Sequence, residues 1–295
     1  MKEHMIDSNG VRIKVYEYSQ TGEPLLLLHY MGGSSAIWRS IIPSFMGKYR
    51  VIAMDIRGHG KSDQPPTGYQ LETLAEDVRA VLDSLEIDKA YIVGSSLGCY
   101  IGTRFASMYP ERVLSLVNSE GALVNKSEGL HTETKEEHLN KYFSSPEQEF
   151  ESREALIQFM KENWLPWSKE RELVMKDYEP RKLENGKVTF ISKRDTLRQI
   201  AEDLYDRRVE HLYENIQCSV LFLPAEKEGD LNKKLEFIKS VKLKLKKSKT
   251  VVIPGTSHAM MFDHSKELIY EINEFLNIQI KEVENNVRYL EKKNF

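Results

Sequence analysis

Short apolar runs recur along the first part of the chain. Each run is about the length of one buried strand, and they fall at residues 25–29, 50–55, 90–93 and 113–117. Ahead of them, Asn9-Gly10 separates two shorter segments, and Asn-Gly favours a two-residue hairpin turn because both turn residues need positive φ. The pattern therefore predicts an N-terminal β-hairpin followed by four buried strands.

Amphipathic stretches separate these runs. Between residues 71 and 85 the apolar positions have helical spacing, and a second helical stretch, 97–109, stops at Pro110. Residues 36–45 are also expected to be helical, with Pro43 kinking or ending the helix. Strands alternating with helices predict an α/β fold, with a mostly parallel sheet and helices on both faces.

The alternation stops in the middle of the chain, where residues 122–205 are charged, Glu-rich and helix-prone without an apolar strand run. It resumes with a strand at 219–223, a helix at 231–245, a strand at 250–253 and a last helix from about Ser265. We therefore expect one α/β core made of residues 1–121 and 206–280. A helical cap, 122–205, is inserted into this core, and residues 281–295 extend the last helix.

Composition narrows the class of protein. The 295 residues include 42 Lys+Arg and 45 Asp+Glu, a formal net charge of −3, with 40% hydrophobic and 29% charged residues. This balance argues against disorder and does not favour a nucleic-acid partner. No apolar run is long enough for a signal peptide or a spanning helix, and two cysteines, Cys99 and Cys218, cannot form a disulfide framework. We expect a cytoplasmic protein without a membrane partner.

A candidate nucleophile lies between an expected strand and an expected helix. Gly94-Ser95-Ser96-Leu97-Gly98 has the G-x-S-x-G pattern of a nucleophile elbow, a turn so tight that its flanking residues must be small. Such a turn holds the Ser96 hydroxyl above the sheet at a helix N-terminus. The helix dipole and the free amide of Leu97 favour an oxyanion there.

A serine hydroxyl needs a general base and an acid that orients the base. His258 follows the late strand on a loop from which it can reach the elbow. The acid is expected after the preceding strand, where Glu226, Glu228 and Asp230 all lie within five positions. Glu120, just past the 113–117 strand, is a further candidate, and spacing alone does not choose among them.

Four motifs in this order resemble the α/β-hydrolase superfamily, specifically its capped esterase and carbon–carbon-bond hydrolase branch. Two are the elbow and Gly255-Thr256-Ser257-His258, which resembles the histidine loop. The others are Leu25 to Gly33, which resembles the oxyanion loop, and Asp55 to Asp63, which resembles the D-x-R-G-x-G-x-S signature. The resemblance covers about residues 7–278 but leaves the inserted segment unmatched.

The resemblance implies roles for further residues. The acid position falls on Glu228, with Asp230 and Glu120 as alternatives, and the oxyanion donors are the backbone amides of Met31 and Leu97. Tyr30 stands where the family usually has glycine, so its side chain is expected to narrow the pocket or to contact the substrate. Trp164 and Trp167 are candidates for lining an acyl pocket from the cap, with packing inside the cap as the alternative.

The function implied is hydrolysis of a small ester or related acyl substrate through a Ser-His-acid triad and an acyl-enzyme. A serine at the elbow argues against haloalkane dehalogenase or epoxide hydrolase chemistry, where relatives place Asp. Carbon–carbon-bond hydrolysis, cofactor-free oxidoreductase or perhydrolase chemistry, and a low-turnover ligand-binding signalling role remain open. The sequence contains no metal-ligand motif and no phosphate or dinucleotide loop, so we expect neither a metal nor a cofactor.

Overall fold

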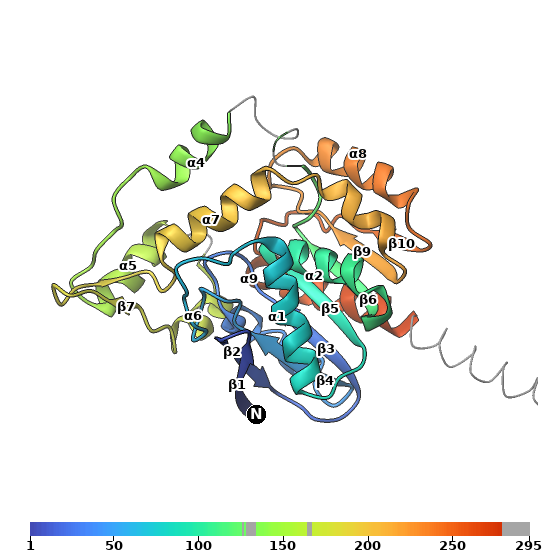
Figure 1. The fold of residues 1–295 in the computed structure, drawn as a ribbon, viewed down its shortest axis with the longest axis horizontal. Helices are drawn as coiled ribbons and strands as arrows, with labels where there is room; N and C mark the ends of the chain where they lie inside the picture. The colour runs from blue at the N-terminus through green and yellow to red at the C-terminus, as the bar shows by residue number, and fades with distance from the viewer. Residues whose placement is uncertain (126, 128–133, 164–166, 279–295) are drawn as a thin grey trace, which may run out of the picture.

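A single eight-stranded sheet organises the computed structural model, which describes residues 1–125, 127, 134–163 and 167–278 (Figure 1). Its strands are β1 (Lys2–Ser8), β2 (Val11–Glu17), β3 (Glu23–Leu28), β4 (Tyr49–Met54), β5 (Ala90–Ser95), β6 (Val113–Ser119), β9 (Ser219–Leu223) and β10 (Ser248–Thr250). In space their order is β1-β2-β4-β3-β5-β6-β9-β10. All neighbours from β4 to β10 pair parallel, whereas β1 and β2 are antiparallel. The predicted mostly parallel α/β sheet is confirmed.

Helices cover both faces of this sheet (Figure 1). The core helices are α1 (Leu71–Ser84), α2 (Leu97–Met108), α8 (Leu231–Lys242), the short α9 (Met260–Asp263) and a helix over 265–278. Successive residues of β3 point to opposite faces, so Leu26 and Leu28 pack in one apolar cluster with α1 and α2. Leu25 and Leu27 pack in the other cluster, with residues of 265–278. A strand buried on both faces explains its continuous apolar run.

The N-terminal hairpin has the predicted turn. Asn9 and Gly10 both have positive φ, 53° and 83°, and β1 pairs with β2 from Lys2↔Glu17 to Ser8↔Val11. This conformation matches the twist of the flanking strands.

Two elements differ from the sequence prediction. Residues 36–45 form two short 3₁₀ turns, η1 (Ser35–Trp38) and η2 (Ile42–Ser44), because Pro43 has no amide hydrogen to continue one helix. The last strand, β10, ends at Thr250, and Ile253 makes only an isolated bridge with Ala225. Pro224 follows the partner strand β9 and likewise offers no donor that would extend the ladder.

The segment between β6 and β9 forms a separate group of elements to one side of the sheet (Figure 1). It contains α4 (Lys135–Phe143), α5 (Arg153–Asn163), α6 (Lys169–Met175) and α7 (Arg194–Tyr205). It also contains a small hairpin, β7 (Arg181–Lys182) with β8 (Val188–Thr189), that the sequence prediction of a helical cap missed. Strands of two residues are too short to produce an alternating pattern. The segment has its own small apolar cluster of Leu156, Met160 and Val188.

Two regions of the sequence prediction lie outside the described residues, namely the C-terminal extension 281–295 and Trp164. Among the helices that the structure describes, none combines the length and apolar character needed to cross a bilayer.

Candidate active site

The turn between β5 and α2 holds Ser96 in a strained conformation, with φ 49° and ψ −111°. Its neighbours must lack side chains. A Cβ on Gly94 would lie 2.5 Å from the amide nitrogen of Cys99, and a Cβ on Gly98 would lie 2.2 Å from the carbonyl oxygen of Leu28. The G-x-S-x-G spacing therefore permits this turn, and positive φ at a non-glycine residue is typical of functional sites.

The segment after β6 wraps over this turn. The Ser96 amide donates to the Ser119 carbonyl at 3.1 Å. A Cβ on Gly121 would come within 2.3 Å of the Ser96 carbonyl oxygen, and the flanking Glu120 and Ala122 have positive φ of 52° and 55°. Two further residues with positive φ thus flank the glycine that lies against the candidate nucleophile.

A small cavity of about 170 Å³ joins the residues expected to react. Ser96 from the elbow, His258 from the loop after β10 and Glu228 from the loop after β9 all line it. Ser96 and His258 lie far apart in the sequence, and the parallel sheet brings the loops that carry them to one edge. The alternative acid Glu120 also lines the cavity, together with Lys234.

Glu228 lies nearest to Nδ1 of His258, which leaves the other ring nitrogen, Nε2, available to act as the general base. Glu228 Oε1 lies 3.8 Å from His258 Nδ1, and both side chains are about half exposed, at 47% and 44%. This distance is longer than a hydrogen bond. Catalytic hydrogen bonds are often long without substrate and shorten in the complex.

The two alternative acids have other partners. Asp230 is the N-cap of α8, where its carboxylate accepts from the Lys233 amide at 3.2 Å. Glu120 is buried and forms an ion pair with Lys234 at 2.6 Å.

The expected oxyanion loop follows β3 and is held by a buried histidine. His29 Nε2 accepts from the Ile56 amide at 3.0 Å, so Nδ1 carries the hydrogen and donates to the Tyr30 carbonyl at 2.7 Å. Burial lowers the pKa of His29 to about 4, which keeps the ring neutral. The ring thereby fixes the backbone that leads to Met31.

Tyr30 occupies its unusual position without backbone strain. The positive φ in this loop belongs to Gly32, at 80°, and not to Tyr30. The Tyr30 ring covers Gly33, where a Cβ would lie 2.9 Å from it, and meets the Phe262 ring edge-on at 6.5 Å between centroids. Glycine at 33 makes room for the tyrosine.

The signature after β4 supports the loops rather than the chemistry. Buried Asp55 accepts from the Ser35 amide at 2.7 Å and from the Lys61 amide at 2.8 Å. Arg57 pairs with Asp77 of α1 at 2.6 Å, and both side chains are buried. His59, also buried, donates from Nδ1 to the Arg57 carbonyl at 3.0 Å. No local sequence pattern predicts Asp77 as the partner of Arg57.

A second cavity, of about 480 Å³, separates the oxyanion loop from the inserted segment. Tyr30 and Met31 line it on one side, and Phe190 and Arg194 line it from the segment. Tyr142 of α4 lines both this cavity and the smaller one with Ser96. The sequence analysis did not identify Tyr142, Phe190 and Arg194, because the sequence predicts helices in this segment but not how they pack against the core. A larger hollow of about 510 Å³ also borders Tyr30, but Ser96, His258 and Glu228 do not line it.

Trp167 packs against other residues of the inserted segment. Its indole Nε1 donates to Glu172 at 3.4 Å, its ring faces Lys161 at 5.5 Å, and it packs against the cluster around Leu156 and Met160. It is absent from the linings of all three cavities above, so the packing alternative fits this residue.

Two other kinds of site receive no support. The described residues contain no group of three His, Cys, Asp or Glu side chains arranged to hold a metal ion. Cys99 is buried beside the elbow, and burial raises the pKa of its thiol well above the ordinary value, which makes it a poor nucleophile.

Part of the sequence is similar to known proteins. The family model for the alpha/beta hydrolase fold matches residues 23–161. Epoxide hydrolase 4 from Mus musculus is 36% identical over 115 residues, which are 38% of this chain and 32% of that protein. The match therefore spans about a third of that relative.

Solved structures match over nearly the whole chain. E-2-(acetamidomethylene)succinate hydrolase superposes with a TM-score of 0.79 at 21% identity, covering 94% of this chain and 99% of that one. Est816, described as an N-acyl homoserine lactone degrading enzyme, superposes with a TM-score of 0.69 at 21% identity, covering 92% and 100%. At this identity the likeness is one of fold.

Proposed function

Because residues 23–161 match the family model for the alpha/beta hydrolase fold, we propose that the chain is a serine hydrolase that cleaves a small ester or related acyl substrate. The observation that carries the proposal is the cavity that Ser96, His258 and Glu228 share, with Ser96 in the strained turn at the start of α2. The partner of such a site is a small molecule, and the chemistry requires neither a metal nor a cofactor.

The proposed reaction begins when Ser96 Oγ attacks the substrate carbonyl and His258 Nε2 takes the hydroxyl proton. The charge on the carbonyl oxygen is stabilised by the amide of Leu97, at the N-terminus of α2, and by that of Met31. His258 then passes its proton to the leaving alcohol, leaving an acyl group on Ser96. A water molecule, deprotonated by His258, attacks this ester and regenerates the serine.

Glu228 is the proposed orienting acid. It lies 3.8 Å from His258 Nδ1, so a small loop movement makes the hydrogen bond that fixes the tautomer and stabilises the imidazolium. Asp230 and Glu120 are occupied, the first with the N-terminus of α8 and the second with Lys234.

An acyl substrate fits a serine nucleophile better than an epoxide does. Attack of Ser96 on an epoxide would give an ether, which water does not readily cleave, whereas a carboxylate nucleophile gives a hydrolysable ester. The relative named as an epoxide hydrolase thus supports the fold and not the substrate. The names of both structural neighbours describe substrates that carry an acyl group, which favours acyl chemistry here as well.

The test is hydrolysis of p-nitrophenyl acetate by the purified wild-type protein and by Ser96→Ala. Loss of the nucleophile should lower kcat by about three orders of magnitude or more, without changing the melting temperature by more than a few degrees. Ser95→Ala is the matched control, because Ser95 lies in the same turn but its hydroxyl is fully buried. Undiminished turnover by Ser96→Ala would reject the proposal. Cleavage only of a carbon–carbon substrate, still dependent on Ser96, would redirect it within the superfamily.

A further inference from the structure

A buried lysine on α8 faces a buried glutamate at the active-site edge of the sheet. Lys234 and Glu120 are 3% and 7% exposed, and Lys234 Nζ lies 2.6 Å from Glu120 Oε1. Lysine is almost never fully buried unless it is paired. Both residues line the cavity of Ser96 and His258, so the pair belongs to the surroundings of the reacting groups.

This pair holds Ala225, where the loop that carries Glu228 begins. Glu120 Oε2 accepts from the Ala225 amide, and Lys234 Nζ donates to the Ala225 carbonyl at 3.3 Å. Both backbone groups of one residue are therefore bound by the two members of the pair. Three residues later, the same loop presents Glu228.

The held loop is joined in turn to the loop of His258. Ala225 forms a bridge with Ile253, and the Lys227 amide donates to the Thr256 carbonyl at 2.9 Å. Thr256 is two residues before His258. A shift of Ala225 would therefore move the acid loop and the histidine loop together.

Glu120 is also linked to the elbow through the next residue of the chain. Glu120 is followed by Gly121, which lies so close to Ser96 that a Cβ would be 2.3 Å from its carbonyl oxygen. Glu120 itself has positive φ, and its amide donates to the Leu223 carbonyl at 3.0 Å. One residue thus touches the end of β9, and its neighbour touches the nucleophile turn.

We propose that Lys234 and Glu120 are positioning residues for the reaction. Together they align the acid loop with the histidine loop, and the ammonium of Lys234 neutralises Glu120 so that Glu228 alone supplies negative charge to His258. This inference rests on the proposed serine hydrolase activity.

A general stabilising role makes a different prediction. A buried ion pair can often be replaced by apolar side chains at no cost to stability, whereas loss of one partner leaves an uncompensated charge. If the pair acts on His258, loss of Lys234 alone has to change how His258 titrates. The other ionisable groups lining this cavity are Glu228, His138, Tyr100 and Tyr142, and they are the same in all variants below.

The experiment compares Lys234→Met, Glu120→Gln and the double variant with the wild type. Methionine keeps the length of the lysine stem, and the glutamine carbonyl can still accept from the Ala225 amide. For each protein, kcat and KM for p-nitrophenyl acetate are measured from about pH 5 to about pH 9, where the acid limb of kcat/KM reports the free-enzyme base. Lys244→Met is the matched control, because Lys244 forms an ion pair of the same 2.6 Å length with Glu214, at the exposed surface.

Lys234→Met is expected to lower kcat about tenfold or more, with KM changed by less than about threefold, because the groups that react are displaced. Its acid limb should move to higher pH, because the unneutralised Glu120 carboxylate favours the charged imidazolium. The double variant, which has neither charge, should recover most of kcat and the wild-type acid limb. Such recovery is a coupling that independent residues do not show. Lys244→Met should match the wild type throughout.

Additive losses in the double variant, or a wild-type acid limb in Lys234→Met, would overturn the proposal. If Lys234→Met does not melt cooperatively, the comparison of Glu120→Gln with the double variant decides, since the proposal requires the double variant to be faster. These outcomes are separate from the proposed function, which fails only if wild-type turnover does not depend on Ser96.

Discussion

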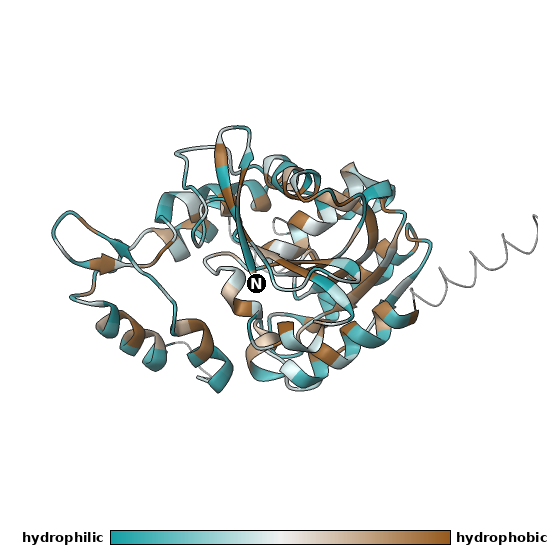
Figure 2. Ribbon diagram, turned by 90° about the horizontal axis from the view of Figure 1, so that it is seen from below, coloured by the Kyte–Doolittle hydropathy of each residue, from teal (hydrophilic) through white to brown (hydrophobic). Residues whose placement is uncertain are grey.

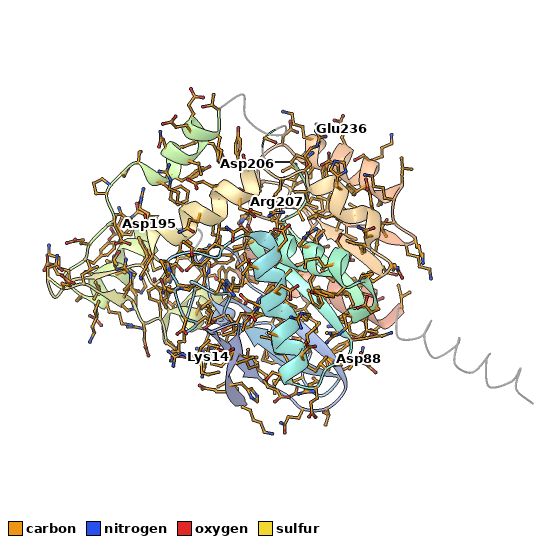
Figure 3. All side chains as sticks on the ribbon, viewed as in Figure 1. Lys14, Asp88, Asp195, Asp206, Arg207 and Glu236 are labelled. Carbon is orange, nitrogen blue, oxygen red and sulfur yellow. The ribbon has the colours of Figure 1, made fainter. Side chains whose placement is uncertain are left out.

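The carboxyl edge of the sheet and the inserted segment are built in different ways. At the edge, each turn is fixed by close backbone contacts, as at Gly98 against Leu28, and by fully buried strands. The inserted segment has a small apolar cluster of its own, and hydrophilic and hydrophobic residues alternate along its ribbon (Figure 2). Charged residues lie along α7 and directly after it. Asp195 is in the first turn of the helix, and Asp206 and Arg207 follow its last residue (Figure 3).

The two regions meet through both apolar and polar contacts. Ile200 and Leu204 of α7 pack in the apolar cluster of α1 and α2, and Val174 of α6 packs in the other core cluster. Arg207, just after α7, donates to Glu72 of α1 at 2.7 Å and to Asp203 of α7 at 2.7 Å. The Leu71 amide donates to Asp203 at 3.0 Å. Glu72, Asp203 and Arg207 do not line the cavity of Ser96, His258 and Glu228. We expect substitutions in the sheet region to act on kcat or on folding, and substitutions in the segment to act on KM.

After Ser96→Ala, the largest effect is expected for Glu228→Gln. An amide at this position favours the wrong tautomer of His258 and cannot stabilise the imidazolium, and the corresponding loss in the serine protease triad is about four orders of magnitude in kcat. Steady-state kinetics with p-nitrophenyl acetate would measure it. The longer, half-exposed contact seen here leads us to expect a loss of at least about a hundredfold.

Asp230→Asn is the matched control for this prediction. Asparagine caps helices about as well as aspartate, so kcat should stay within about threefold and stability within about 0.5 kcal/mol. If Asp230→Asn were inactive and Glu228→Gln active, the orienting acid would be Asp230, two residues further along the loop.

The next largest effect is expected for Arg57→Met, and it concerns stability. Arg57 and Asp77 are both buried, so the substitution leaves an uncompensated carboxylate and should lower the free energy of unfolding by about 3–5 kcal/mol. In the inserted segment, Lys135 pairs with Asp206 at the surface, and Lys135→Met should cost less than about 1 kcal/mol. Urea unfolding of both variants would measure the contrast. Equal losses would show that the segment is as tightly built as the core.

The pH dependence of stability should follow the buried histidines of the sheet region. Burial lowers the pKa of His29 to about 4 and that of His59 to about 3. Between these values and the unfolded value near 6.5, the unfolded chain binds more protons, so stability falls as the pH falls through this window. Each histidine contributes roughly 2 kcal/mol of loss between pH 7 and pH 5. Asp55, whose pKa is raised by burial, opposes part of this loss.

The variant His59→Asn tests this assignment, because asparagine can still donate to the Arg57 carbonyl but does not titrate. Urea midpoints at pH 7 and pH 5 should differ by about half as much as in the wild type. His211→Asn, which alters an exposed histidine, should leave the difference unchanged. An unchanged difference in His59→Asn would mean that other groups control acid unfolding.

The sheet region and the inserted segment also differ in how much of their structure the sequence predicts. The mostly parallel sheet and the elbow could be predicted from local patterns, because the apolar runs have the length of buried strands and the glycines at 94 and 98 leave room for the tight turn. The ion pairs of Arg57 with Asp77 and of Lys234 with Glu120 join residues 20 and 114 positions apart, and no local pattern predicts them. The sequence of the inserted segment predicts helices but not how they pack, so it could not predict that Tyr142 lines the two cavities.

The smallest effect is expected in the segment, at Tyr142, which lines both the cavity of Ser96 and the larger cavity beside Tyr30. Its side chain is 55% exposed, so its removal should cost little stability. For Tyr142→Ala we expect KM for p-nitrophenyl butyrate to rise about threefold to tenfold, with kcat within about threefold, because lost contacts bind substrate and transition state alike. Tyr270→Ala, at an exposed tyrosine on the helix over 265–278, is the control and should change neither constant. A fall in kcat with unchanged KM would instead place Tyr142 among the groups that act only in the transition state, and would end the division between a reacting edge and a substrate-binding segment.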